Sequence, residues 1–202
     1  MKRSKEEAEQ TRQAILSAAL EVFYTRGVTR ASLQEVATAA GVTRGAVYWH
    51  FRDKSHLYMT LYEELTARYA VRPEDFAART YASLAEFRQD LERLISSYQQ
   101  DRSFRMFIQI LHSRMEYIEE MKEIVENEQL KQQRMVAAYL HAFRQLQADG
   151  HLSPKIDCER AALLLFTVID GIFDSWGIDE GLFHPGLTPL DLLNELFDRL
   201  TG

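Results

Sequence analysis

The sequence is poor in cysteine, glycine and proline. Of its 202 residues, one is cysteine, nine are glycine and four are proline. The single cysteine, Cys158, excludes a disulfide framework, and so little glycine and proline excludes a collagen-like or linker-like chain. Hydrophobic residues make up 46% and charged residues 27%, as in globular proteins that fold on their own. The length is that of one long domain or two short ones.

Long apolar runs are also missing. The longest nearly apolar stretch, residues 161–173, contains Thr167 and Asp170 and falls short of the ~20 residues that cross a bilayer. The N-terminal stretch MKRSKEEAEQ is charged and has no apolar segment behind it of the kind found in secretory signals. We therefore expect a cytoplasmic protein with no membrane partner.

Strand-like alternation of apolar and polar residues is absent, and helical spacing covers most of the chain. We predict an all-α protein of about nine helices, with capping boxes at Ser32 and Ser83, an N-cap at Thr43 and a helix end at Gly150. Residues 72–82 are interpreted as a connection, because Pro73 is expected to end the helix before it. The expected helices cover residues 7–26, 33–40, 43–50, 55–71, 83–98, 104–114, 117–148, 157–176 and 189–201.

Charge is distributed unevenly. The chain has a net charge of −6, yet residues 1–56 hold nine Lys or Arg against six acidic residues, so that this part carries +3 and the remainder −9. A basic N-terminal part on an acidic body indicates that one end of the protein meets a polyanion.

Two short helices separated by Ala40-Gly41-Val42 have the dimensions of a helix-turn-helix. Gly41 can adopt the positive φ that lets the second helix leave at a steep angle. The apolar residues of the two helices are expected to pack on the first long helix, and they are Leu33, Val36, Ala37, Ala40, Val47 and Phe51. The remaining face of the second helix holds hydrogen-bond donors, flat rings and one guanidinium. Arg44 is placed to pair with guanine in a major groove, and Gly45 permits close approach of the backbone.

The segment from Gly41 to Phe51, followed by Asp53-Lys54-Ser55, resembles the signature of TetR-family transcriptional regulators. The likeness extends upstream to Thr11 and covers about the first 60 residues. The form Val-Thr-Arg-Gly-Ala-Val-Tyr-Trp-His-Phe is similar to the AcrR-like repressors of multidrug efflux genes. The resemblance implies a homodimer on a pseudo-palindromic operator in double-stranded DNA, with residues 1–55 as the DNA-binding domain and residues 56–202 as the effector-binding and dimerisation domain. The implied DNA-binding residues are Ser32, Thr43, Arg44, Gly45, Tyr48, Trp49, His50 and Lys54, of which Ser32 and Lys54 would contact phosphates.

The C-terminal part is rich in aromatic and flexible apolar residues at helical spacing. Such residues usually form core, but helical bundles also place ligand sites between helices and line them with these side chains. We therefore expect a hydrophobic small-molecule effector. Its candidate contacts are Tyr62, Thr66, Tyr69, Tyr98, Phe107, Ile110, Met135, Tyr139 and Asp170. Asp170 stands in an otherwise apolar helix, where it can balance a cationic ligand or form a hydrogen bond across a dimer interface.

The last two helices are expected to form the dimer interface, as the resemblance also implies. Residues 157–176 are apolar nearly all round, so one bundle alone offers too few neighbours to cover them, and Gly171 would allow a second chain to approach closely. The residues assigned to the interface are Leu165, Ile169, Phe173, Trp176, Leu193 and Phe197.

Signals for catalysis are missing. His50 and His56 lack the spacing of metal ligands, and the sequence has neither a glycine-rich phosphate loop nor a GxSxG elbow. Cys158 is interpreted as a packed thiol rather than a thiolate sensor. We expect a regulator that needs no metal or cofactor and is not an enzyme. The alternatives are a ligand-binding helical protein without operator function, a regulator that needs a co-repressor, and an enzyme in the C-terminal bundle.

Overall fold

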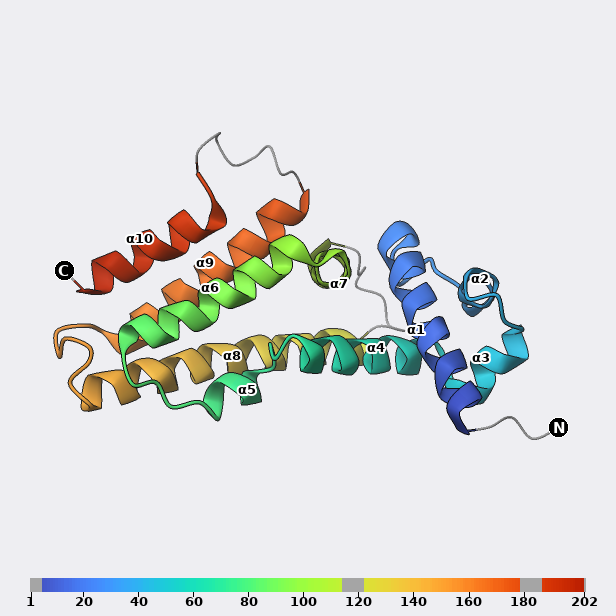
Figure 1. Cartoon of the computed structure of the whole chain (residues 1–202), viewed down its shortest axis with the longest axis horizontal. Coiled ribbons are helices and arrows are strands. Elements are labelled where there is room, and N and C mark those ends of the chain that lie inside the picture. The colour runs from blue at the N-terminus through green and yellow to red at the C-terminus, as the bar shows by residue number, and fades with distance from the viewer. Residues whose placement is uncertain (1–4, 114–121, 179–186, 202) are drawn as a thin grey trace. The chain divides into compact units, whose positions relative to one another are not determined.

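The computed structural model describes residues 5–113, 122–178 and 187–201, and in these ranges all regular structure is helical (Figure 1). The prediction of an all-α protein is confirmed. The part of the predicted 117–148 helix before Lys122 lies outside the described residues. None of the described helices is long and apolar enough to cross a membrane. The helices are α1 (Lys5–Arg26), α2 (Leu33–Ala39), α3 (Arg44–His50), α4 (Lys54–Arg68), α5 (Pro73–Ala77), α6 (Leu84–Gln100), α7 (Arg102–Ser113), α8 (Lys122–Ala148), α9 (Cys158–Ile178) and α10 (Pro189–Thr201).

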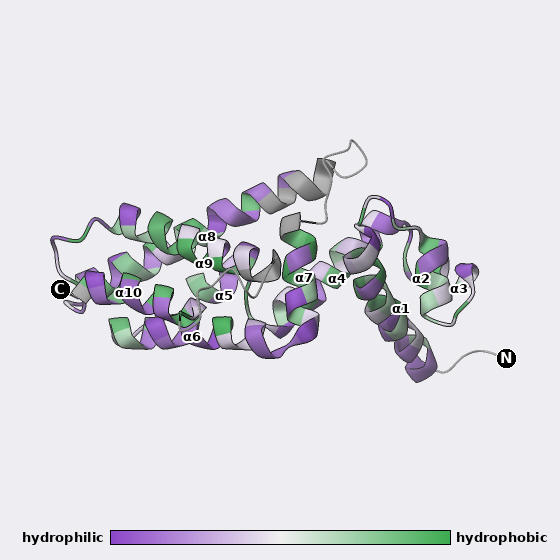
Figure 2. Cartoon of the chain, turned by 90° about the horizontal axis from the view of Figure 1, so that it is seen from above, coloured by the Kyte–Doolittle hydropathy of each residue, from purple (hydrophilic) through white to green (hydrophobic). Residues whose placement is uncertain are grey.

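The chain forms two compact units. The N-terminal unit consists of Met1–Leu65 with Met106–Glu126, and the C-terminal unit of Thr66–Arg105 with Asn127–Gly202. Helices α1 to α3 contact one another within the N-terminal unit and are called the head below. In Figure 2, hydrophobic and hydrophilic residues alternate along α1, α6 and α10, the banding expected of helices that bury one face.

The head is held together by a small apolar core. Ile15, Ala19 and Phe23 of α1 are fully buried, as are Val36 of α2 and Val47 of α3. The predicted packing of the two short helices on α1 is thus confirmed for these positions. Ala40, which was expected in the same core, is only half-buried because it is the residue that caps the end of α2.

The turn between α2 and α3 depends on Gly41. Its φ is +66°, as predicted. The N–H of Gly41 donates to the Thr38 carbonyl at 3.2 Å and that of Val42 to the Ala37 carbonyl at 3.0 Å. These two bonds make a Schellman motif, which satisfies the last carbonyls of α2 and turns the chain into α3.

The end of α4 differs from the prediction. The helix stops at Arg68 rather than near residue 71, because Ala70 takes a left-handed conformation with φ +50°. The N–H of Val71 then donates to the Thr66 carbonyl at 3.1 Å. Pro73 begins a new helix, α5, in the segment expected to be a connection. Proline is well suited to the first helical position because its ring fixes φ and no N–H is needed there.

The core of the C-terminal unit is centred on Phe87 of α6. The Phe87 ring packs edge-on against Phe143 of α8 and Phe197 of α10, with centroids 5.4 and 5.8 Å apart, and lies 4.7 Å from the ring of Tyr81. Helix α10 contacts both α6 and α9 (Figure 1). The predicted end of α8 is confirmed, since Gly150 has φ +77° and the N–H of His151 donates to the Leu146 carbonyl at 2.8 Å.

The side chains assigned to a dimer interface lie mostly in this core. The buried ones are Leu165, Ile169, Phe173, Leu193 and Phe197, each no more than 8% exposed. The side chain of Trp176 lies outside the described residues. Helical periodicity identifies apolar residues but not which of them the chain covers itself. The leucines that α9 and α10 leave on the surface are Leu163, Leu164 and Leu192, at 57%, 51% and 38% exposure.

This distribution predicts a large loss of stability for one truncation on α10 and a small change for another. Phe197→Ala removes a ring that is 1% exposed, so the free energy of unfolding should fall by about 3–5 kcal/mol. Leu192→Ala serves as the control and should change it by less than about 1 kcal/mol. Urea denaturation followed by circular dichroism measures both. Equal losses would contradict the assignment of Phe197 to the core of the single chain.

Candidate nucleic-acid interface

Helix α3 presents a polar and aromatic face to solvent. Its inner side is anchored by Val47 and by Phe51, which follows the helix, and both are buried. On the outer side, Trp49 is 73% and Tyr48 46% exposed. The His50 ring stands edge-on to Trp49, with centroids 4.4 Å apart. Large exposed rings on a two-turn helix indicate contact with another molecule, because water is a poor environment for them.

Arg44 and Tyr48 form a pair on this face. One guanidinium nitrogen of Arg44 donates to the Tyr48 hydroxyl at 3.1 Å, and the guanidinium carbon lies 5.3 Å from the centre of the ring. The two residues are one helical turn apart, so the pair forms within α3 alone. It holds a positive, fork-shaped donor group at the start of the helix.

Two further residues expected at DNA cap the helices of the head. The Thr43 hydroxyl accepts from the Ala46 N–H at 3.1 Å and the Ser32 hydroxyl from the Glu35 N–H at 3.2 Å, so both predicted caps are confirmed. The Ser32 N–H in turn donates to Glu35 at 2.9 Å. Hydrogen bonds from the backbone and side chain of Ser32 lower the pKa of the Glu35 carboxyl, which keeps this capping box charged.

Lys54 makes its contacts within the protein. Its ammonium donates to the backbone carbonyls of Thr29 at 2.7 Å and Ala31 at 3.3 Å. It therefore ties the start of α4 to the loop between α1 and α2. A phosphate contact by the same ammonium remains a prediction.

Asp53 has a role that the sequence analysis missed. Its carboxylate accepts from the His56 N–H at 2.8 Å and from the Arg52 side chain at 2.7 Å. The Arg52 hydrogen bond, followed by that of His56, lowers the Asp53 pKa. Asp53 is thus the N-cap of α4, and the signal for it was an Asp directly before the helical spacing begins.

Gly45 is not required by the fold of the head. A Cβ at this position would meet only the Thr43 hydroxyl oxygen, at an ordinary 3.8 Å. Glycine inside a helix costs about 0.5–1 kcal/mol relative to alanine. Since nothing in the described chain prevents a side chain here, the missing Cβ points to close approach by a molecule from outside.

The residues expected to contact an effector are distributed over both units. Tyr62, Phe107 and Ile110 belong to the N-terminal unit, where the rings of Tyr62 and Phe107 meet edge-on at 5.5 Å. All three are buried. The other six are in the C-terminal unit, and they are Thr66, Tyr69, Tyr98, Met135, Tyr139 and Asp170.

Within the C-terminal unit, two of these tyrosines share one aromatic cluster. The Tyr69 ring stacks on Phe104 at 4.1 Å, and its hydroxyl donates to Asp101 at 2.5 Å. Burial, together with Asp101, raises the pKa of Tyr69 to about 12. Tyr98 is fully buried against the same Phe104 and donates to the carbonyl of Phe173 at 3.2 Å. Tyr98 thus belongs to the core, whereas Tyr69 keeps some exposure.

The environment of Tyr139 disfavours loss of its proton. Burial raises the pKa of the Tyr139 hydroxyl most, and electrostatic interactions with Tyr81 and Asp170 raise it further. Asp170 itself is half-buried, as is Met135. The arrangement thus keeps Tyr139 a neutral hydroxyl near a carboxylate, a combination suited to recognising a polar group.

The described part of the chain gives little support for a metal site or a reactive thiolate. No group of three or more His, Cys, Asp or Glu side chains there could hold a metal ion. Burial raises the pKa of the Cys158 thiol, which fits a packed thiol better than a reactive thiolate.

Two family models match the sequence. Residues 15–60 match that of bacterial regulatory proteins of the tetR family, and residues 82–186 match the C-terminal region of MAATS-type transcriptional repressors. The HTH-type transcriptional regulator TtgR of Pseudomonas putida is 34% identical over 182 residues, which cover 87% of this chain and 84% of TtgR. The chain belongs to the TetR family of transcriptional regulators. The family resemblance drawn from the sequence is confirmed, and the chain is a regulator rather than an enzyme.

Two solved structures have a similar fold along most of the chain. NalD, the secondary repressor of the MexAB-OprM multidrug efflux pump in Pseudomonas aeruginosa, is 34% identical, with a TM-score of 0.81 over 97% of this chain and 98% of that chain. A SmeT–triclosan complex has a TM-score of 0.79 over 94% of this chain and 91% of that chain. At 23% identity, SmeT shows the shared fold alone. SmeT is the repressor of the Stenotrophomonas maltophilia efflux pump SmeDEF.

Gly45 gives a test of the interface that separates binding from folding. Gly45→Ala should raise the free energy of unfolding by up to about 1 kcal/mol and weaken binding to cognate DNA by about tenfold, the effect of losing one good base contact. Thermal unfolding and fluorescence anisotropy measure the two quantities. Ser17→Ala, at an exposed position of α1, is the control and should leave DNA affinity unchanged. If Gly45→Ala binds DNA as tightly as the wild type, α3 does not approach DNA at this residue.

Proposed function

We propose that the protein is a ligand-responsive transcriptional repressor that binds a pseudo-palindromic operator as a homodimer and is released by a hydrophobic small molecule. Residues 1–55 act as the DNA-binding domain and residues 56–202 as the effector-binding and dimerisation domain. By the likeness to NalD, the genes that it controls encode a multidrug efflux pump or a similar transporter. Because its partner is the bacterial chromosome, we place it in the cytoplasm.

The outward face of α3 is the observation that carries this proposal. Arg44 supplies the bidentate donor that reads guanine in a major groove, and Tyr48 and His50 can donate to phosphate oxygens. Trp49, at 73% exposure, gains an apolar neighbour on binding. Each head reads one half-site, so a dimer is needed to contact two successive major grooves about 34 Å apart.

The exposed side of α9 supports the homodimer. Leu163 and Leu164 stand there with more than half of their side-chain surface exposed. Gly171 is exposed on the same helix, and a Cβ at this position would meet nothing within 4 Å. Since no neighbour within the chain requires a glycine in the middle of this helix, its presence favours close contact with another chain. A second copy would cover Leu163, Leu164 and Gly171 by twofold symmetry.

The effector part of the proposal rests on the tyrosines and Asp170. SmeT forms a complex with triclosan, a hydrophobic phenol, and aromatic walls suit hydrophobic compounds. Asp170 would balance a positive charge on a cationic effector. A coupling of about 1–3 kcal/mol between effector and operator is enough to change DNA affinity by about 5- to 150-fold.

Selection of DNA by the full-length protein tests the operator function. Rounds of binding to a random double-stranded library should enrich a pseudo-palindrome. On the enriched sequence, Arg44→Ala should lose about 1–3 kcal/mol of binding free energy, and on random DNA much less, because base readout rather than phosphate attraction is removed. Anisotropy titrations give both affinities. Failure to enrich any symmetric site, or equal losses on both DNAs, would contradict the proposal.

A charge on the exposed side of α9 tests the dimer. Leu164→Glu should produce folded monomers, because the carboxylate would have to be buried between two chains, while a side chain that is 51% exposed adds little to the single chain. Light scattering gives the mass and circular dichroism the fold. Leu130→Glu, at a 43% exposed leucine of α8, is the matched control and should remain dimeric. A stable Leu164→Glu dimer would place the interface elsewhere.

A further inference from the structure

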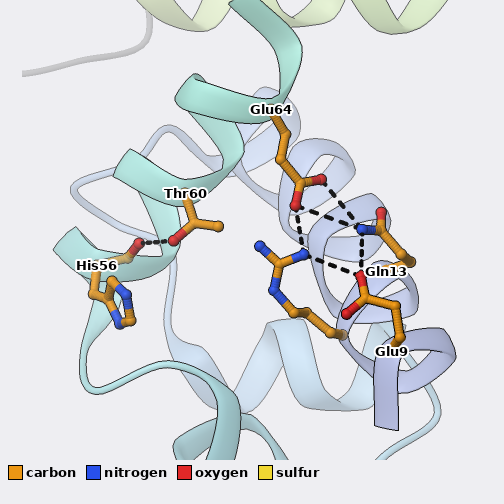
Figure 3. Close-up of polar contacts among 6 residues, drawn as sticks. Glu9, Gln13, His56, Thr60 and Glu64 are labelled. Carbon is orange, nitrogen blue, oxygen red and sulfur yellow. Dashed lines mark hydrogen bonds and ion pairs between the residues drawn. The ribbon is translucent and has the colours of Figure 1, made fainter. Parts of the chain in front are cut away.

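A polar network joins α1 to α4. None of its members is among the residues assigned to DNA. One Arg12 guanidinium nitrogen lies 3.2 Å from a Glu9 carboxylate oxygen and 2.5 Å from one of Glu64. The Gln13 amide donates to Glu9 at 3.0 Å and to both oxygens of Glu64, at 3.3 and 3.5 Å. Figure 3 shows Glu64 pointing from α4 toward Gln13 on α1. Arg12 and Glu64 each keep 28% of their side-chain surface exposed, so the contact is partly shielded from water.

The members of this network satisfy one another. Arg12 stands between two carboxylates, and Gln13 donates to both of them. The hydrogen bond from Gln13, and to a smaller extent the charge of Arg12, lowers the pKa of Glu9, which therefore stays ionised. Two donor side chains of α1 thus converge on Glu64, the one member that comes from α4.

Helix α4 is attached to the head at a second point. Lys54 binds the carbonyls of Thr29 and Ala31, ten residues before Glu64, which is about 15 Å along a helix. Between these points the rings of Phe23 and Tyr58 pack at 6.3 Å. One attachment would leave the helix free to pivot, whereas two separated attachments fix its direction.

We infer that Glu64 is a positioning residue for operator binding: through Arg12 and Gln13 it fixes the angle at which α4 leaves the head. This inference rests on the proposed function. In a dimer, that angle sets the distance between the two recognition helices, and the distance must match the spacing of the half-sites. Glu64 touches no DNA in this scheme and acts only through α1.

The polar nature of the contact supports a role in geometry. Leu57 and Leu61 of α4 are already buried, and apolar contacts of this kind tolerate small shifts and rotations. Hydrogen bonds to a carboxylate are directional and weaken steeply when their angle changes. A partly buried ion pair adds little net stability, so its effect lies in selecting one orientation.

Operator spacing provides the test. The full-length protein is titrated with three kinds of duplex: the selected palindrome, the same palindrome with one base pair added or removed between the half-sites, and a single half-site. The affinity of Glu64→Ala for the half-site should stay within about twofold of the wild-type value. Its affinity for the palindrome should fall by about threefold or more, which is the low end of the coupling measured between residues in contact. The ratio of its affinities for the natural and the altered spacings should also be smaller than in the wild type.

Partner and control variants decide whether Glu64 acts through α1. Arg12→Ala should reproduce the spacing defect, and the Arg12→Ala/Glu64→Ala protein should be no worse than either single variant. Glu64→Gln keeps the acceptor oxygen and should restore part of the discrimination. Thr60→Ala removes a hydroxyl that donates to the His56 carbonyl within the same helix, and it should behave as the wild type.

Several results would overturn the inference. Wild-type spacing discrimination in Glu64→Ala would show that the contact does not set the angle. Parallel losses on half-site and palindrome would mean that Glu64 only stabilises the head, and additive effects of the two alanines would mean that the residues act separately. A wild-type protein that shows no preference for any palindrome would instead contradict the proposed function.

Discussion

The candidate DNA-binding surface depends on the packing that stabilises α3, a helix too short to be stable alone. Helix α3 has seven residues, about half of what an isolated helix needs to form in water. Val47 and Phe51 bury one side of it, and this packing decides at once that α3 exists and which residues face outward. The exposure of Arg44, Tyr48 and Trp49 is therefore a consequence of the apolar core of the head. Because Val47 and Phe51 must be buried, the aromatic side of α3 is left exposed to water.

Local chemistry could be predicted from the sequence. The caps at Ser32 and Thr43 and the turn at Gly41 involve atoms no more than five residues apart, so the residue types and their spacing contain the necessary information. Val47 and Phe51 followed from helical periodicity in the same way. Pro73 shows the limit of such signals, because a proline fits both just after the end of one helix and at the first position of the next, and only the backbone path decides between the two.

Contacts between distant segments could not be predicted. Arg12 and Glu64 are separated by 52 residues, and the acceptors of Lys54 are backbone carbonyls that carry no sequence signal. For α9, periodicity showed apolar residues all round but not that the chain itself covers Leu165 and leaves Leu164 exposed. These features depend on how helices cross, which is set by the sum of many weak contacts. They are also the features through which the head is positioned for a symmetric target.

A footprint on the DNA upstream of the protein's own gene tests the central claim most directly. Hydroxyl-radical cleavage in the presence of the wild-type protein should show two protected segments related by an approximate dyad, with centres about one helical turn of DNA apart. That pattern requires two heads, each with α3 in a major groove, held at a fixed distance. A single protected segment would contradict the dimeric arrangement. Uniform protection or none would contradict operator recognition itself.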